Sequence, residues 1–229
     1  MAGCSSTGRS DGLAFQEWIC HRAALPIRWL RQLCVSGLDL PGSYKIGGWY
    51  NSNAFTDQFY TGSAFSSVQA FGSFARSRKN DWSVYAVIDQ MVYRPGKMSA
   101  GGVSVFFRAM GAPGNRNLVN VFVDAGVVCK GLFDRDNDTV GLGVNWARIS
   151  DTARAEDSVV DRSSYLPRPV RSSETDLDLS YQAQLAPWWI LQPYVQYVFK
   201  PGAGIVSSTN PAKVIGDALV LGLRSTLSF

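Results

Sequence analysis

The fold is decided by residues 174–185, which read Glu174-Thr-Asp-Leu-Asp-Leu-Ser-Tyr-Gln-Ala-Gln-Leu185. Two sets of side chains alternate along this stretch. Successive side chains of a β-strand point to opposite faces, whereas a helix of about 3.6 residues per turn would mix the two sets. The first set is Thr175, Leu177, Leu179, Tyr181, Ala183 and Leu185, and the second is Glu174, Asp176, Asp178, Ser180, Gln182 and Gln184. We therefore predict a strand with one apolar and one polar face.

The same alternation extends toward both ends of the chain. Residues 190–199 repeat it, and so does a last run from Leu219 that finishes on Phe229, the final residue. Upstream, the pattern covers residues 44–51, 82–93, 103–110, 118–127 and 139–149. The chain is therefore predicted to be all-β, with about eight antiparallel strands of about ten residues each.

Composition limits the class of protein. The chain has 229 residues, of which 46% are hydrophobic and 17% charged, so it is too apolar to be disordered. No apolar stretch approaches the roughly 20 residues that a membrane helix needs, but strands of about ten residues suffice for a membrane β-barrel. Long strands, aromatic residues near strand ends such as Trp188 and Trp189, and an aromatic C-terminus favour a transmembrane β-barrel over a soluble β-sandwich.

The connections between these strands differ in length. Residues 111–117 and 186–187 are short turns, whereas residues 150–173 and 201–214 are long and polar or glycine-rich. Outer-membrane barrels carry short turns at one end and long loops at the other. We therefore expect the two short turns at one end of the barrel and the long loops at the outer end.

The first 37 residues differ in composition from the rest. They hold Cys4, Cys20 and Cys34 of the four cysteines, together with His21, the single histidine. A zinc site here would lack closely spaced cysteine pairs, and the segment lacks the basic start and apolar core of a secretion signal. We predict a poorly structured leader over 1–37 and a barrel portion over 38–229.

The sequence contains no motif for catalysis, a cofactor or a metal. One histidine, placed in the leader, leaves no Ser-His-Asp arrangement, so we expect no enzymatic activity and no cofactor. Asp134, Asp136 and Asp138 have the spacing of a calcium loop, but Thr139 stands where that loop needs glycine. We therefore favour a solvated, hydrogen-bonded turn at this point.

The net charge of +4 raises the question of nucleic-acid binding. The basic residues are scattered, and Arg162, Arg168 and Arg171 share a segment with Asp157 and Asp161. A nucleic-acid site needs a basic stripe or patch. We therefore interpret the segment as a solvated loop and predict no nucleic-acid partner.

The polar sides of the strands form the candidate site. In a barrel they would line a water-filled pore, where carboxylates, amides and guanidinium groups offer hydrogen bonds to hydroxyls, and aromatic rings stack on sugars. The candidate pore-lining residues are Asp89, Arg108, Phe122, Asp124, Glu174, Asp176, Asp178, Gln182, Gln192, Tyr194, Gln196 and Arg224. Asp89 depends most on register, because its neighbours Val87 and Met91 are apolar and a one-residue slip exchanges the faces. The alternative for each residue is that it only solvates the pore.

Several strings in this order resemble the C-terminal half of the carbohydrate-selective porin family, the OprB type, over about residues 38–229. They are Gly42-Ser-Tyr-Lys-Ile-Gly-Gly-Trp-Tyr50, Tyr85-Ala-Val-Ile-Asp-Gln-Met91, Gly131-Leu-Phe-Asp-Arg-Asp-Asn-Asp-Thr-Val-Gly-Leu-Gly143, Glu174 to Leu185, Gln192-Pro-Tyr-Val-Gln-Tyr197 and Asp217-Ala-Leu-Val-Leu-Gly-Leu-Arg224. The closing Phe229 resembles the end of the last strand of that family.

The resemblance implies a bacterial outer-membrane channel of about sixteen strands through which glucose and related sugars diffuse passively. It also implies that Phe229 is the signal read by the barrel-assembly machinery, and that sugars and outer-membrane lipid are partners, with a homo-oligomer left open. This chain departs from the family because it lacks a signal peptide and holds about half the strands, so we expect a truncated form. The alternative is a self-contained eight-strand barrel with a structural or binding role.

Overall fold

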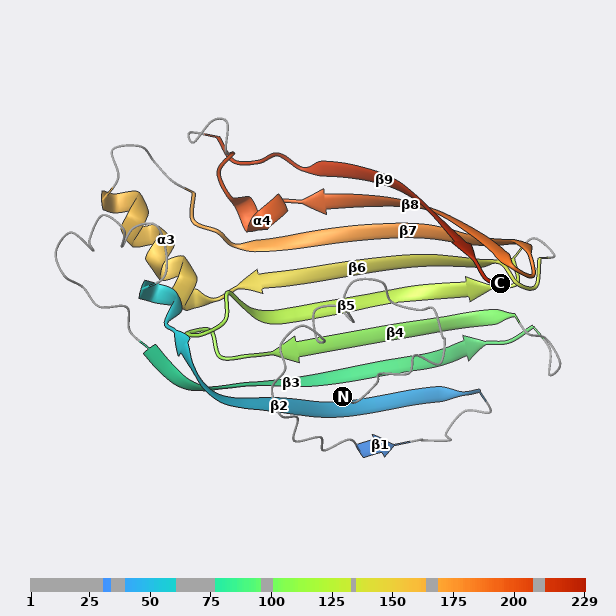
Figure 1. Cartoon of the computed structure of the whole chain (residues 1–229), viewed down its shortest axis with the longest axis horizontal. Coiled ribbons are helices and arrows are strands. Elements are labelled where there is room, and N and C mark those ends of the chain that lie inside the picture. The colour runs from blue at the N-terminus through green and yellow to red at the C-terminus, as the bar shows by residue number, and fades with distance from the viewer. Residues whose placement is uncertain are drawn as a thin grey trace.

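The computed structural model describes residues 31–33, 40–60, 77–95, 101–132, 135–163, 169–207 and 213–229. Most of them form one nine-stranded antiparallel sheet, in which the spatial order of the strands follows the chain (Figure 1). Cys20, His21 and Cys34, and the leader apart from residues 31–33, lie outside the described residues. The predicted all-β antiparallel class is confirmed.

The predicted strands are all present. The strands are β1 (Arg31–Leu33), β2 (Gly42–Thr56), β3 (Ser77–Tyr93), β4 (Gly102–Gly111), β5 (Val119–Lys130), β6 (Thr139–Ile149), β7 (Ser173–Ala186), β8 (Trp189–Phe199) and β9 (Ala218–Leu227). The bounds of β6 equal the predicted ones. The prediction that the last strand ends on Phe229 is wrong, because β9 ends at Leu227.

The sheet is a single layer and is open. Each strand pairs with its neighbours in sequence, so β1 and β9 are the two edges and do not pair with each other. Among the described residues there is no second sheet, which excludes the β-sandwich, and the open edges differ from a self-contained eight-strand barrel. No helix in the described part of the chain is long and apolar enough to cross a membrane.

The two ends of the sheet carry different connections. Because the strands alternate in direction, the segments after β2, β4, β6 and β8 meet at one end, which we call the loop end. The segments after β3, β5 and β7 lie at the other end with the C-terminus (Figure 1). The turn at 111–117 follows β4 and so lies at the loop end. The expectation that both short turns share one end is therefore wrong.

A small apolar core lies at the loop end. The helix α3 (Asp151–Ser163) follows β6 directly, and the amide of Ala153 donates to Oγ of Ser150, which caps the first turn at 3.3 Å. Ala153 is fully buried against Ile149 and Ala203. Ala203 belongs to the helical turn α4 (Pro201–Gly204), and the short helix η1 (Gln58–Tyr60) lies beside α3 (Figure 1).

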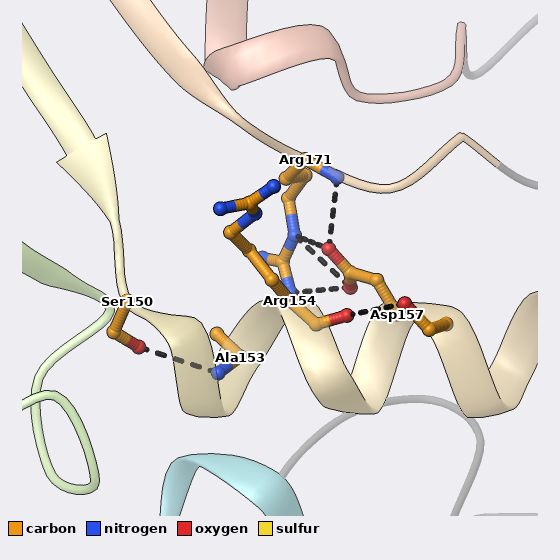
Figure 2. A network of polar contacts seen from close by, with 6 residues as sticks. Ser150, Ala153, Arg154, Asp157 and Arg171 are labelled. Carbon is orange, nitrogen blue, oxygen red and sulfur yellow. Dashed lines mark hydrogen bonds and ion pairs between the residues drawn. The ribbon is translucent and has the colours of Figure 1, made fainter.

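An ion pair joins α3 to the segment that precedes β7. The Arg171 guanidinium donates to both carboxylate oxygens of Asp157, with an Nη2–Oδ1 distance of 2.7 Å, and the Arg171 backbone amide adds a further hydrogen bond (Figure 2). The hydrogen bonds that Arg171 donates to the Asp157 carboxylate raise the pKa of Arg171, so the guanidinium stays charged. The solvated loop expected here is therefore wrong, because residues 151–163 form a helix with an anchored face.

A second anchor lies at the opposite end of the sheet, in the turn before β6. Asp138 is buried, and its carboxylate accepts hydrogen bonds from the Tyr181 hydroxyl, the Arg135 guanidinium and the Gln184 amide. These contacts agree with a hydrogen-bonded turn, although Asp138 is buried where we expected it solvated. Asp134 lies outside the described residues, and within them no cluster of three metal-ligating side chains exists.

Candidate functional site

The pairing register separates the sheet into an apolar and a polar face. Residues directly opposite each other on paired strands lie on the same face. One such row crosses seven strands and is apolar throughout: Ile88, Phe107, Ala125, Val144, Leu177, Tyr197 and Leu219. Leu221 and Leu223 beside it are 70% and 67% exposed. Continuous exposed apolar surface of this kind indicates contact with lipid or another apolar partner.

The polar face holds the predicted site residues together. A row through the middle of the sheet pairs Arg108 with Asp124, Asp124 with Asn145, and Asn145 with Asp176. The next row joins Asp89, Phe106, Gly126, Gly143, Asp178 and Gln196. All twelve candidates lie on this one face, on strands β3, β4, β5, β7, β8 and β9. Asp89, the residue most dependent on register, is among them because it lies opposite Phe106.

Arg108 occupies the centre of this face. Its Nη1 atom lies 3.3 Å from Oδ2 of Asp124, and its guanidinium carbon lies 4.9 Å from the centroid of the Phe106 ring. Phe106 and Arg108 are two positions apart on β4, so both side chains point to the same side. The ion pair and the cation–π contact hold the guanidinium along the wall, and Asp124 is only 7% exposed.

A second polar contact lies one strand further on. The Asn145 amide donates from Nδ2 to Oδ2 of Asp178 at 2.8 Å, bridging β6 and β7. Asp176, in the row beside it, has one carboxylate oxygen that is buried without a hydrogen-bond partner among the described residues. Asn145 was not among the predicted site residues. The signal that would have found it is its parity, since it alternates with Val144 and Trp146.

Aromatic rings cover glycines on the polar face. A side chain on Gly126 would collide with the Phe106 ring, and one on Gly222 would collide with the Tyr194 ring. The missing side chains leave room for both rings close to the backbone of the neighbouring strand. Phe106 is a second residue that sequence reasoning missed, because an apolar side chain on the polar face gives no polarity signal.

The remaining candidates are distributed toward the two ends of the sheet. Glu174 lies at the loop end, where its carboxylate accepts a hydrogen bond from the Gly202 amide of α4, so it anchors a loop as well as facing the site. Phe122 lies in the same row, separated from Glu174 by Ala147. Gln192 lies opposite Arg224 between β8 and β9, nearer the end with the C-terminus.

The net charge of the twelve candidates differs in sign from that of the chain as a whole. Among the twelve candidates, the carboxylates are Asp89, Asp124, Glu174, Asp176 and Asp178, and the guanidinium groups are Arg108 and Arg224. The wall therefore presents mainly hydrogen-bond acceptors, with amides and two fixed cations interspersed. Such a surface can exchange hydrogen bonds with water and with hydroxylated solutes, and nothing in it resembles a catalytic dyad or triad.

A single antiparallel sheet of long strands in sequential order, with one apolar and one polar face, is how the wall of a transmembrane β-barrel is built. The comparisons with known proteins agree with this class. A model of the carbohydrate-selective porin, OprB family, matches residues 6–229. The chain therefore belongs to the OprB family of carbohydrate-selective porins.

Individual relatives support the same assignment. Porin B of Pseudomonas aeruginosa is 27% identical over 210 residues, which cover 88% of this chain and 44% of that protein. A high-pH structure of OprB from Pseudomonas putida matches with a TM-score of 0.72 and 25% identity, covering 87% of this chain and 47% of the other. The chain thus spans less than half the length of the relatives that it matches.

Proposed function

We propose that this chain forms part of the wall of a passive channel for sugars, and not an enzyme. The observation that carries the proposal is the polar face, where charged, amide and aromatic side chains from six strands lie on one side of an otherwise apolar sheet. Facing a water-filled lumen, these groups would replace part of the hydration of a passing hydroxylated solute. The substrate class follows from family membership, since the family model describes carbohydrate-selective porins.

The same two faces support a location of the protein in a membrane. The apolar face, with Leu219, Leu221 and Leu223 exposed, would contact the lipid of a bacterial outer membrane. The loop end would face outward, and the end with the C-terminus would face the periplasm. Phe229 lies beyond β9 with its side chain fully exposed, where the barrel-assembly machinery could bind it as a C-terminal signal.

Sugar-dependent swelling of liposomes tests the proposed function. The full chain is refolded from denaturant into liposomes, and swelling in iso-osmotic glucose is compared with that of protein-free liposomes. Swelling above the control is the expected result, and its absence with protein inserted would contradict a channel formed by this chain.

A matched pair of variants tests which face lines the channel. Asn145 and Val144 are neighbours on β6 with side chains on opposite faces. A larger side chain narrows a pore only when it points into the lumen. Asn145→Trp should therefore slow swelling by about two-fold or more. Val144→Trp adds the same ring on the apolar face and should leave the rate unchanged. Equal effects of the two variants would contradict the assignment of the polar face to the lumen.

A further inference from the structure

Aromatic residues on the polar face lie directly opposite glycine in three cross-strand pairs. The pairs are Gly47–Tyr85, Gly126–Phe106 and Gly222–Tyr194. In each pair, a side-chain carbon on the glycine would collide with the ring. Each ring therefore occupies the space that a side chain on the glycine would need, close to the backbone of the neighbouring strand.

The three rings differ in how much of their surface is free. The Arg108 guanidinium carbon lies 4.9 Å from the centroid of the Phe106 ring, so a cation already occupies that ring. Tyr85 is half-buried. Tyr194 is 39% exposed, and no described residue places a cation or a second ring against it. Of the three rings, Tyr194 therefore has the most surface available to a solute.

Hydrogen-bonding side chains surround Tyr194 on the polar face. Gln192 and Gln196 lie two positions before and after it on β8, so their side chains point to the same side of the sheet at about 7 Å along the strand. Ser180 lies opposite Tyr194 on β7, and Arg224 lies opposite Gln192 on β9. Within the described part of the chain, the side chains of Gln192, Gln196 and Arg224 have no hydrogen-bond partner. Unpartnered donors and acceptors therefore lie beside the free ring.

A pyranose ring offers two kinds of surface to a protein. Its hydroxyl groups project around the edge of the ring, while axial C–H groups make each face apolar. The face of an aromatic ring carries the negative part of a quadrupole and attracts such C–H groups, whereas amides and a guanidinium bind hydroxyls at the edge. The surroundings of Tyr194 have the same two parts, since a free ring lies among unpartnered polar side chains. An ion would leave the ring unused, and an apolar solute would leave the polar groups unused.

We propose that Tyr194 is the stacking ring of a binding site for one hexopyranose unit, which we call the Tyr194 site. Gln192, Gln196 and Arg224 would bind the hydroxyls of the sugar at the edge of the ring. Gly222 contributes by having no side chain, because it leaves the space that the Tyr194 ring fills. This inference rests on the proposed function, because it takes the polar face as the one that sugars reach.

Saturation-transfer difference NMR on the full chain in micelles tests the Tyr194 site without a sealed channel. The detergent is lauryldimethylamine oxide, which has no sugar headgroup. The probes are methyl β-D-glucopyranoside and sorbitol, an open-chain polyol that has hydroxyls but no ring face. Saturation should reach the axial hydrogens H1, H3 and H5 of the glucoside more strongly than H2 and H4, because the first set presents the larger apolar face to the ring. Sorbitol should receive about three-fold less saturation than the glucoside.

Matched variants separate the ring of Tyr194 from its hydroxyl and from its strand. Tyr194→Leu removes the ring and should lower saturation of the glucoside by about three-fold or more, which abolishes the preference over sorbitol. Tyr194→Phe keeps the ring and should change the signal by less than about two-fold. Tyr197→Leu is the control, because Tyr197 lies on the same strand with its side chain on the apolar face, and it should leave both signals unchanged. Circular dichroism checks that each variant keeps its strands.

The Tyr194 site and the channel can fail separately. Equal saturation of the glucoside and sorbitol in the unsubstituted chain would overturn the site, and this comparison needs no variant. A loss with Tyr197→Leu as large as that with Tyr194→Leu would also overturn it. Preferred saturation of the glucoside without swelling in glucose would support the site and contradict the proposed function. Swelling without that preference would support the channel and overturn the site.

Discussion

Arg108 is the residue on which the polar face depends most directly. It pairs with Asp124 at 3.3 Å and lies over the Phe106 ring, so one guanidinium joins the charged and the aromatic parts of the wall. Asp124 is 7% exposed and therefore has little water of its own to replace a lost partner. At this scale, side chains on the wall hold one another in place.

Replacing Arg108 should destabilise the sheet through Asp124. Arg108→Gln leaves a nearly buried carboxylate without its cation, which should cost about 1–3 kcal/mol in the free energy of unfolding. Adding Asp124→Asn removes the orphaned charge and should restore part of the loss. Urea unfolding in detergent of both single variants and the double variant measures the coupling. Simple additivity of the two losses would contradict a functional ion pair.

Glycine at position 126 should be required for the placement of the Phe106 ring. A side-chain carbon there would collide with the ring and with the Leu142 carbonyl, so Gly126→Ala should cost about 1–3 kcal/mol in the free energy of unfolding. Gly111, the last residue of β4, is the matched control, because a side chain there meets nothing within 4 Å. Gly111→Ala should be neutral or slightly stabilising. Equal losses for the two variants would contradict the ring-on-glycine packing.

At the scale of elements, two connections of this sheet are each held by a single carboxylate. Asp138 holds the turn before β6 to β7, and Asp157 holds α3 to the segment before β7. Each carboxylate accepts hydrogen bonds from a side chain and from a backbone amide. The connections at both ends of the sheet are therefore anchored by charge and hydrogen bonding, with little apolar core to help them.

The turn anchored by Asp138 should lose stability in acid. Burial pushes the pKa of Asp138 upward, but the hydrogen bonds from Tyr181, Arg135 and Gln184 outweigh it and hold the pKa below its ordinary value of 3.8. Because the folded pKa is the lower one, the stabilisation is complete above 3.8 and is lost as the pH falls through the folded-state value.

Unfolding measured from pH 7 to pH 2 tests this dependence. Asp138→Asn should lower the free energy of unfolding by about 2 kcal/mol at pH 7 and should remove the part of the acid loss that belongs to this group. Asp136→Asn, in the same turn but exposed, is the control and should keep the wild-type profile. An Asp138→Asn profile with the same acid slope as wild type would contradict the assignment.

Breaking the Arg171–Asp157 pair should loosen α3 without unfolding the sheet. The two side chains are 24% and 15% exposed, and Arg171→Gln should raise amide hydrogen exchange in α3 by about five-fold. Arg148→Gln breaks a more exposed pair with Asp151, whose side chain is 69% exposed, and should change exchange by less than about two-fold. A larger effect of Arg148→Gln would contradict the role given to Arg171.

The strands could be predicted from the sequence, whereas the loops could not. Alternation gave the bounds of β6 and the face of every candidate from Asp89 to Arg224, because a period of two is imposed by the strand itself. Helix α3 was missed because its apolar face is small and it is held by Arg171, which is distant in sequence. Phe106 was missed because its apolar ring gives no polarity signal, and Asn145 was missed although it alternates with Val144 and Trp146.

At the scale of the whole molecule, the described residues form one open sheet. Within them the sheet has one apolar and one polar face, edges at β1 and β9 that do not pair with each other, and a buried apolar cluster at the loop end. In a bilayer, a sheet of this kind is stabilised by lipid on its apolar face and by strands paired at its edges. Water on the polar face satisfies its polar groups. These features agree with a chain that belongs to the OprB family and spans less than half the length of its relatives.

We expect one face of this sheet to contact lipid and the other to contact water. The most direct measurement places single dye-labelled cysteines along β7 in liposomes, at Asp176, Asp178 and Ser180 on the polar face and at Leu177 and Leu179 on the apolar face. Aqueous iodide should quench the dye at the first set, and spin-labelled lipid should quench it at the second. Quenching by iodide at both sets, or the reverse assignment, would contradict the account.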